Sequence, residues 1–140
     1  MTEIPNHRIT PERVTTLTDG HVFVFGSNLA GRHGAGAAKL ACDRFGAEYG
    51  VGQGPTGRCY AIPTKDRQIR TLSLNQIADY VKAFASHAVE TDGTFLVTEI
   101  GCGLAGYEPH HIAPMFDWTI DQENIHLPLR FWEFLLKQTR

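Results

Sequence analysis

The stretch FGSNLAGRHGAGAAK, residues 25–39, concentrates glycines where a backbone with few side chains can bind an anion. These glycines are Gly26, Gly31, Gly34 and Gly36. Consecutive N–H groups in such a loop can point at one anion, and a following helix adds the positive end of its dipole. The loop therefore predicts a phosphate-binding site. The alternative interpretation is a tight turn that needs glycine for a positive φ and for close helix packing.

The two commonest phosphate-binding motifs do not fit this loop. When Gly31 is taken as the first glycine of a Walker loop, the second falls at Gly36, but Ala37 stands where that motif requires lysine. A dinucleotide fingerprint that starts at Gly34 lacks its third glycine. The loop alone therefore leaves the identity of the ligand open.

A second glycine-rich loop, GCGLAG at residues 101–106, follows another predicted strand. Two such loops at neighbouring strand ends can hold the two ends of a diphosphate between them. Cys102 in this loop is a candidate nucleophile, but the nucleophile elbow needs glycine two residues to either side, where Ile100 and Leu104 stand. We therefore interpret Cys102 as a buried structural cysteine.

Lys65 lies in the segment IPTKD, at the end of a third predicted strand. Lysine is usually a solvated surface charge. At the mouth of a pocket, however, its amine can contact phosphate or, when partly desolvated, attack a sugar carbonyl. His33, His110 and His111 are interpreted as surface or capping residues, because no carboxylate or cysteine is suitably spaced with them for a metal. We predict no metal and no cofactor.

The hydrophobic pattern predicts strands that alternate with helices. An arm over residues 1–20 precedes predicted strands at 21–26, 58–66 (ending at Pro63), 94–101 and 124–128, and predicted helices at 35–46, 73–90 (capped by Ser73, with Ile77, Tyr80, Val81, Phe84 and Val89 on its apolar face), 109–120 and 129–138. This alternation calls for a mainly parallel sheet with helices on both faces. Ligands of such sheets bind beyond the carboxyl ends of the strands, here the loops after residues 26, 63 and 100.

Length and composition predict one compact domain in the 140 residues. The chain is 42% hydrophobic and 20% charged, and its net charge of −2 gives no reason to expect strong nonspecific binding to nucleic acid. No apolar run approaches the roughly 20 residues that cross a bilayer, and the first residues lack the order of a signal peptide, so we expect no membrane partner and a cytoplasmic location. The three cysteines are far apart, which predicts free thiols.

Three stretches, taken in order, resemble the macro domain, the ADP-ribose-binding α/β/α module. They are Asn28 with GAGAA at 34–38, IPTK at 62–65 and IGCGLAGY at 100–107. The likeness covers most of residues 21–117 and is strongest to the glycohydrolases that remove ADP-ribose from protein carboxylates or DNA bases, and to small macro-like proteins of phages and bacteria. It implies a single macro-like domain over residues 1–140, with a three-layer α/β/α fold around a mainly parallel, mixed central sheet.

The resemblance also implies a role for each matching residue. Lys65 would attack the anomeric carbon of the ring-opened ribose, and Asn28 would hydrogen-bond the distal ribose. The diphosphate would be cradled by two backbone segments, formed by Gly34, Ala35, Gly36 and Ala37 and by Gly101, Cys102, Gly103, Leu104, Ala105 and Gly106. Tyr107 would close over the ribose, or would be a half-buried aromatic on the shoulder of the loop.

The sequence departs from the glycohydrolase pattern at Ala105, where the resemblance implies an acid that assists proton transfer. Glu108, Asp66 and Glu99 are the candidates to replace it. Two functions follow: hydrolysis of an ADP-ribosyl linkage on DNA or protein with Lys65 as nucleophile, or binding of ADP-ribose or a related nucleotide signal without turnover. A third is an interaction protein that dimerises or docks through residues 129–138, although core packing is the commoner use of such an apolar stripe.

Overall fold

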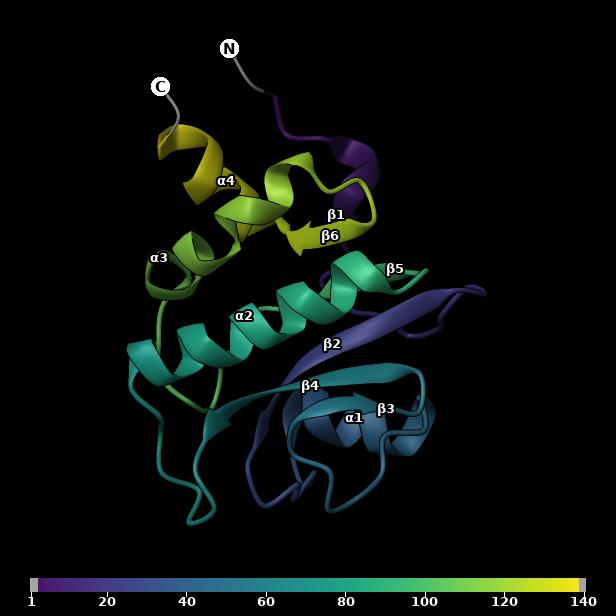
Figure 1. The fold of residues 1–140 in the computed structure, drawn as a ribbon, viewed down its shortest axis with the longest axis vertical. Helices are drawn as coiled ribbons and strands as arrows, with labels where there is room; N and C mark the ends of the chain where they lie inside the picture. The colour runs from purple at the N-terminus through teal and green to yellow at the C-terminus, as the bar shows by residue number, and fades with distance from the viewer. Residues whose placement is uncertain (1–2, 139–140) are drawn as a thin grey trace.

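The computed structural model describes residues 3–138, whose strands form one six-stranded sheet in the order β1-β6-β5-β2-β4-β3 (Figure 1). The strands are β1 (Ile9–Thr10), β2 (His21–Asn28), β3 (Gly54–Thr56), β4 (Cys59–Lys65), β5 (Thr94–Val97) and β6 (Ile125–Pro128). Neighbouring strands are parallel except β3, which is antiparallel to β4. The predicted α/β class with a mainly parallel, mixed sheet is therefore confirmed.

Four α-helices and two 3₁₀ helices accompany the sheet in residues 3–138. They are η1 (Asn6–Arg8), α1 (Gly36–Arg44), α2 (Leu74–Glu90), α3 (Pro109–Ile112), η2 (Ala113–Asp121) and α4 (Leu129–Gln138). The helix predicted over 109–120 is thus a short α-helix that continues as a 3₁₀ helix. No helix in the described residues is both long and apolar enough to cross a membrane.

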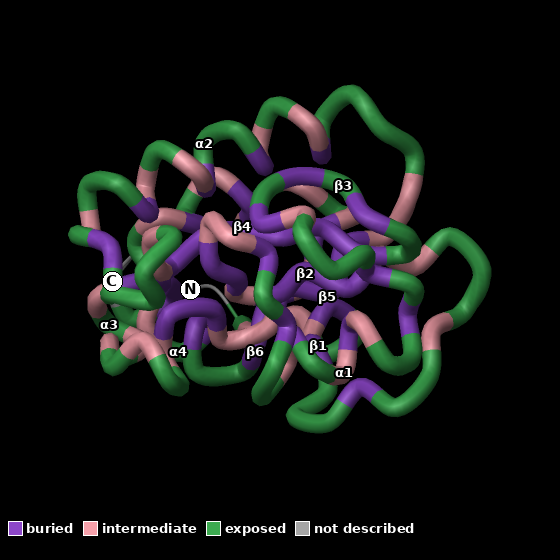
Figure 2. Tube along the Cα trace, turned by 90° about the horizontal axis from the view of Figure 1, so that it is seen from below, coloured by how far each residue is buried: buried purple, intermediate pink, exposed green. Residues whose placement is uncertain are grey.

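Alternate residues of the central strands belong to two different hydrophobic clusters. In β2, Phe23 and Phe25 pack with Ala38 and Ala41 of α1, whereas Val24 belongs to the cluster that includes α2 and α4. Successive side chains of a strand point to opposite faces of the sheet, so each face is covered by a separate apolar cluster. Figure 2 shows the buried strands in the middle of the molecule and the exposed outer sides of the helices around them.

Helix α2 is the best predicted element of the chain. Its N-terminus has a full capping box, in which the Ser73 hydroxyl accepts from the N–H of Gln76 at 3.2 Å and the Gln76 side chain accepts from the N–H of Ser73 at 3.0 Å. Val89, expected on the apolar face, is 60% exposed, and Ala88 is buried instead. The buried stripe keeps spacings of three and four, and Val89 lies about 100° further round the helix.

The N-terminal arm contributes a strand and a buried cation that the sequence did not predict. β1 pairs with β6, and Arg8 beside it is 4% exposed. The Arg8 guanidinium donates to four backbone carbonyls, those of Thr119, Ile120, Gln122 and Ile125, at 2.7 to 3.1 Å. It also lies 4.9 Å from the ring centre of Trp132, whose indole N–H donates to the Arg8 carbonyl. Arg8 therefore joins the first and last parts of the chain.

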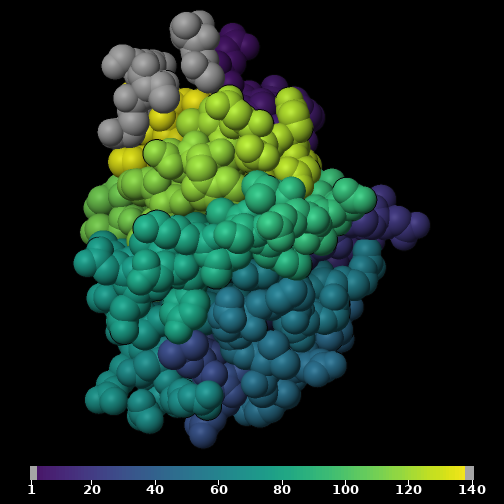
Figure 3. Space-filling view, viewed as in Figure 1, coloured from purple at the N-terminus to yellow at the C-terminus, as the bar shows by residue number. Residues whose placement is uncertain are grey.

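Strands β5, β2 and β4 are neighbours and run parallel, so their carboxyl ends meet at one edge of the sheet. Figures 1 and 3 show the loops after β2 and β4 near each other at the lower edge of the molecule. β4 does not end at Pro63 as predicted but continues to Lys65. The three loops that the sequence analysis predicted to bind a ligand therefore lie at one edge of the sheet.

Candidate functional site

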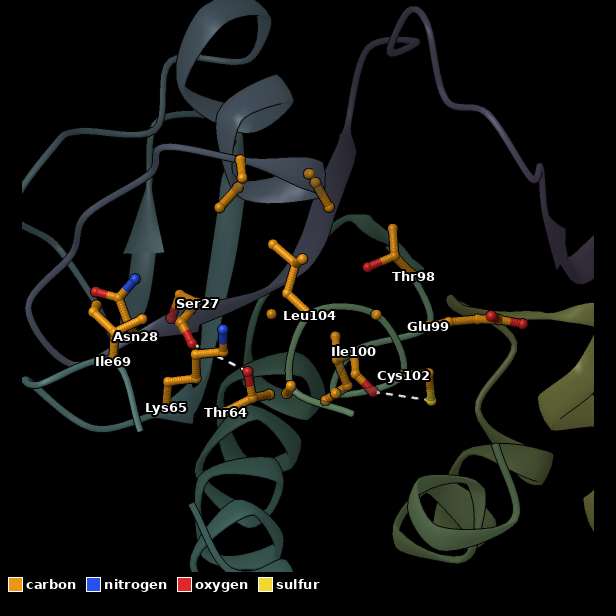
Figure 4. A pocket seen from close by; sticks show the side chains of 18 of the residues that line it. Ser27, Asn28, Thr64, Lys65, Ile69, Thr98, Glu99, Ile100, Cys102 and Leu104 are labelled. Atoms are coloured by element: carbon orange, nitrogen blue, oxygen red, sulfur yellow. Dashed lines mark hydrogen bonds between the residues drawn. The ribbon is translucent and has the colours of Figure 1, made fainter. Parts of the chain in front are cut away.

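The loops after β2, β4 and β5 and the start of α1 enclose a pocket of about 550 Å³ at this edge (Figure 4). This volume lies within the range of small-molecule sites. The lining residues that the sequence singled out are Asn28, Gly34, Ala35, Gly36, Ala37, Lys65, Glu99, Gly101, Cys102, Gly103, Leu104 and Ala105. Gly106 and Tyr107 lie outside this lining. Residues far apart in the sequence therefore share one cavity.

The start of α1 presents its backbone to the pocket. Ala35 is the N-cap residue, and no side chain caps the helix there. A Cβ added to Gly34 would meet no atom within 4 Å, so this glycine keeps space open instead of allowing tight packing. Gly36 has the same free space, but its φ of +59° also favours glycine. Gly31 is different, because its φ is +70° and an added Cβ would stand 2.3 Å from the carbonyl carbon of Gly50. The loop thus contains both kinds of glycine, and its helix end offers uncapped N–H donors that suit an anion.

The second glycine loop faces the first across the pocket. Gly101 has a φ of +73°, and a Cβ there would stand 3.1 Å from the Ile112 side chain, which explains the glycine. The loop closes through hydrogen bonds from the Gly106 N–H to the Gly103 carbonyl (3.0 Å) and from the Tyr107 N–H to the Gly101 carbonyl (2.9 Å). An added Cβ at Gly103 would meet nothing within 4 Å. This loop therefore also presents bare backbone to the cavity.

Asn28 shapes the first loop from within. Its side-chain amide donates to the Arg32 carbonyl at 2.8 Å, and its side-chain oxygen accepts from the Arg32 N–H at 2.9 Å. Each polar group of the side chain has one partner in the loop, and the implied hydrogen bond to a ribose stays a prediction. These bonds hold Arg32 at the rim, where that exposed cation lines the pocket. Sequence reasoning missed Arg32 because nothing in its spacing distinguishes it from a surface charge.

Lys65 lies opposite Asn28 at the end of the paired strands. The register shifts between Ser27 and Asn28, because Ser27 pairs with Pro63 and Asn28 with Lys65. Proline has no N–H to donate, which suits it to this irregular end of the ladder. The Lys65 carbonyl accepts from the Leu29 N–H at 3.0 Å, and its half-buried side chain extends into the pocket (Figure 4). This hydrogen bond thus fixes the backbone position from which the Lys65 side chain extends.

The acids proposed to replace the missing one have other partners. The Glu99 carboxylate, the one acidic side chain in the described pocket lining, forms two hydrogen bonds with the Arg130 guanidinium, at 2.7 and 2.5 Å. Asp66 lies outside the lining, and its side chain accepts from the N–H groups of Gln68 and Arg70. These hydrogen bonds lower the pKa of Asp66. Glu108 caps the short α3. Glu99 is therefore the acid that the pocket itself offers.

Cys102 and Tyr107 occupy different places at this loop. Cys102 is half-buried in place of the predicted full burial, because the loop leaves its thiol at the pocket wall, where it donates to the Ile100 carbonyl at 3.4 Å. Burial raises the pKa of Cys102 to about 12, which keeps it a neutral thiol. The Tyr107 hydroxyl donates to the Leu72 carbonyl at 2.7 Å and its ring packs on the core, so Tyr107 is a half-buried aromatic beside the pocket.

The histidines of these loops differ from the prediction at one position. His33 is buried, not at the surface, with its ring edge-on to Phe25 and its Nε2 3.0 Å from the Glu48 carbonyl. The aromatic neighbours explain this burial. His111 caps α3 as expected, since its Nδ1 accepts from the Glu108 N–H at 3.0 Å. In residues 3–138, no group of three His, Cys, Asp or Glu side chains is arranged to hold a metal ion.

Comparisons of the chain with protein-family models, with curated proteins and with solved structures found no match. The likeness to macro domains therefore remains a prediction from three sequence stretches. The groups that the site offers for chemistry are bare backbone from two loops, two cations, and one carboxylate paired with Arg130.

Proposed function

We propose that this chain is an ADP-ribose-binding protein built as a macro-like, three-layer α/β/α domain. One observation carries the proposal: the uncapped start of α1 and the bare 101–105 segment line the same pocket, together with Arg32 and Lys65. Backbone N–H groups and nearby cations are what a diphosphate requires, because they donate to its oxygens and offset its charge.

In this proposal, two walls of the pocket hold the ligand. The diphosphate lies between Gly34–Ala37 and the Gly101–Ala105 segment, and the terminal ribose extends toward Lys65. The volume of about 550 Å³ exceeds what one phosphate needs and suits a nucleotide-sized ligand. The ordered likeness to macro-domain stretches is what selects ADP-ribose among such ligands.

Hydrolysis of an ADP-ribosyl linkage on DNA or protein is the second candidate function, and the Lys65 amine in the pocket favours it. The neutral amine would add to C1 of the ring-opened ribose, and the carrier would leave with a proton. Water would then hydrolyse the resulting Schiff base, which releases ADP-ribose and restores the amine. Glu99 is the lining acid that this route has at hand. Its pairing with Arg130 favours binding without turnover as the first function.

Two measurements separate these functions. Calorimetry with ADP-ribose tests binding, and we expect one site per chain. Incubation with ADP-ribosylated DNA and protein tests hydrolysis, which should disappear in Lys65→Ala and in Lys65→Arg, because guanidinium keeps the charge but offers no amine nucleophile. Lys65→Arg should lose less ADP-ribose binding than Lys65→Ala. Binding without release in the wild-type protein would reject hydrolysis, and absence of binding at millimolar ADP-ribose would reject both functions.

A further inference from the structure

Two exposed apolar side chains stand at the mouth of the same pocket. Five large hydrophobic residues of the described chain are exposed: Tyr49, Ile69, Val89, Leu104 and Leu129. Two of them, Ile69 at 38% and Leu104 at 73%, line this one cavity. In Figure 4 they lie on either side of Lys65. Isolated exposed apolar residues are ordinary, but two from different loops at one pocket indicate a contact with a ligand.

Ile69 is held in a conformation that isoleucine rarely adopts. Its φ is +63°, the left-handed region, and it is the one residue other than glycine with a positive φ in the described chain. The turn is fixed by Asp66, whose carboxylate accepts from the N–H groups of Gln68 and Arg70, while the Ile69 N–H donates to the Asp66 carbonyl at 3.1 Å. Such strain in a β-branched residue is characteristic of functional sites, because the surrounding structure must impose it.

The two loops that carry these side chains are joined to each other. The Thr71 hydroxyl donates to the Ala105 carbonyl at 3.0 Å, and the Tyr107 hydroxyl donates to the Leu72 carbonyl at 2.7 Å. Each bond links the loop of Ile69 to the loop of Leu104. The two apolar side chains therefore keep their relative position without a ligand, as a preformed subsite requires.

Charge around the two side chains restricts what they can contact. Arg32 and Lys65 line the same pocket, and Arg67 and Arg70 are exposed in the turn that carries Ile69. Asp66 is the one acid in that turn, and its side chain is 3.5 Å from the Arg70 guanidinium. A cationic group placed here would meet repulsion from these positive charges. An uncharged group would meet no such repulsion, and apolar side chains of both loops line the pocket.

We propose that Ile69 and Leu104 form an apolar subsite for an uncharged planar ring joined to C1 of the ligand's terminal ribose. This inference rests on the proposed ADP-ribose site, in which that ribose extends toward Lys65. The subsite makes Ile69 and Leu104 specificity-determining residues: they select ligands by the group attached to the ribose. The class of ligand is an ADP-ribose that carries a neutral ring such as a dihydropyridine.

Three soluble nucleotides test the subsite by calorimetry: ADP-ribose, NADH and NAD⁺. NADH carries an uncharged dihydronicotinamide on the ribose, and NAD⁺ carries the same ring with a positive charge. We expect NADH to bind about tenfold more tightly than ADP-ribose, because the ring covers apolar surface of both side chains. NAD⁺ should bind more weakly than NADH. If ADP-ribose binds but NADH is no tighter, or NAD⁺ equals NADH, the subsite is wrong while the proposed function stands. If ADP-ribose does not bind, both fall.

Variants assign the effect to the two side chains. In Ile69→Asn and Leu104→Ser, the ratio of the NADH and ADP-ribose affinities should fall from about ten to about one. Val89→Asn is the matched control, because Val89 is also exposed and apolar but lies on α2, and it should keep the ratio. Asparagine accepts a positive φ, so Ile69→Asn should melt at or above the wild-type temperature. An unchanged ratio in both subsite variants would overturn the assignment.

Discussion

Gly31 and Gly34 lie three residues apart in the same loop, and the structure predicts opposite outcomes for their replacement by alanine. At Gly31, φ is +70° and the new Cβ would stand 2.3 Å from the Gly50 carbonyl carbon and 2.5 Å from the Val51 nitrogen. The left-handed conformation costs alanine about 1 kcal/mol. Moving the backbone of residues 50–51 to relieve the overlap adds about 1–3 kcal/mol. Gly31→Ala should therefore lose about 2–4 kcal/mol of unfolding free energy.

Gly34→Ala should leave the fold intact and weaken the binding of ADP-ribose. Its φ lies outside the left-handed region, and an added Cβ would meet no atom within 4 Å. Its unfolding free energy should stay within about 0.5 kcal/mol of wild type or rise slightly, because alanine restricts the unfolded chain. The new methyl would project into the proposed diphosphate site, so ADP-ribose binding should weaken about tenfold.

Urea unfolding of both variants, followed by calorimetry with ADP-ribose, is the assay. Stability and binding should separate: Gly31→Ala should lose stability, and Gly34→Ala should lose ADP-ribose binding at constant stability. It is refuted if Gly31→Ala is as stable as wild type. It is refuted for the site if Gly34→Ala binds ADP-ribose as tightly as the wild-type chain does.

Three further predictions concern the fold and its titrating groups. Arg8→Ala should lower the unfolding free energy, measured in urea, by about 3–5 kcal/mol, because four carbonyls lose their buried donor. Arg13 is exposed, so Arg13→Ala should stay within about 0.5 kcal/mol of wild type. Equal effects of the two substitutions would contradict this role of Arg8. Burial raises the pKa of Cys102 to about 12, so alkylation of this thiol at pH 8 should be roughly 10³-fold slower in the folded than in the urea-unfolded protein. Mass spectrometry measures the two rates, and similar rates would exclude this burial. Burial and the neighbouring His21 lower the pKa of His126, so its contribution to stability should be full above about pH 6.5 and be lost as the pH drops through the lowered value. Urea midpoints measured from pH 7 to 5 should therefore fall less in His126→Gln than in the wild-type protein. An equal fall in both would count against this role of His126.

The sequence was sufficient where local pattern and tertiary packing agree. The apolar run of β2 and the capped, periodic α2 were predicted because each has a strong signal of its own. The loop positions followed from parallel topology, since carboxyl ends of adjacent parallel strands meet at one edge. β1 and β3 were not predicted, because strands of two and three residues show no periodicity and are defined by their pairing with a neighbouring strand.

The parts of the site that sequence reasoning could not give depend on long-range contacts. The bond between Glu99 and Arg130 joins residues 31 positions apart. Neither local segment contains a pattern that predicts this bond, yet the bond determines whether the Glu99 carboxylate is free to act as an acid. Asn28 shows the same difficulty at short range. Its motif implied a ligand contact but did not predict that its side chain also hydrogen-bonds the backbone of Arg32 four residues on.

The central claim is that the pocket at the ends of β2, β4 and β5 binds ADP-ribose. Calorimetric titration of the folded wild-type chain with ADP-ribose tests it most directly. The account predicts one site per chain with a dissociation constant below about 1 mM, equivalent to more than about 4 kcal/mol of binding free energy. Absence of measurable binding at millimolar ADP-ribose, with the protein shown to be folded, would contradict it.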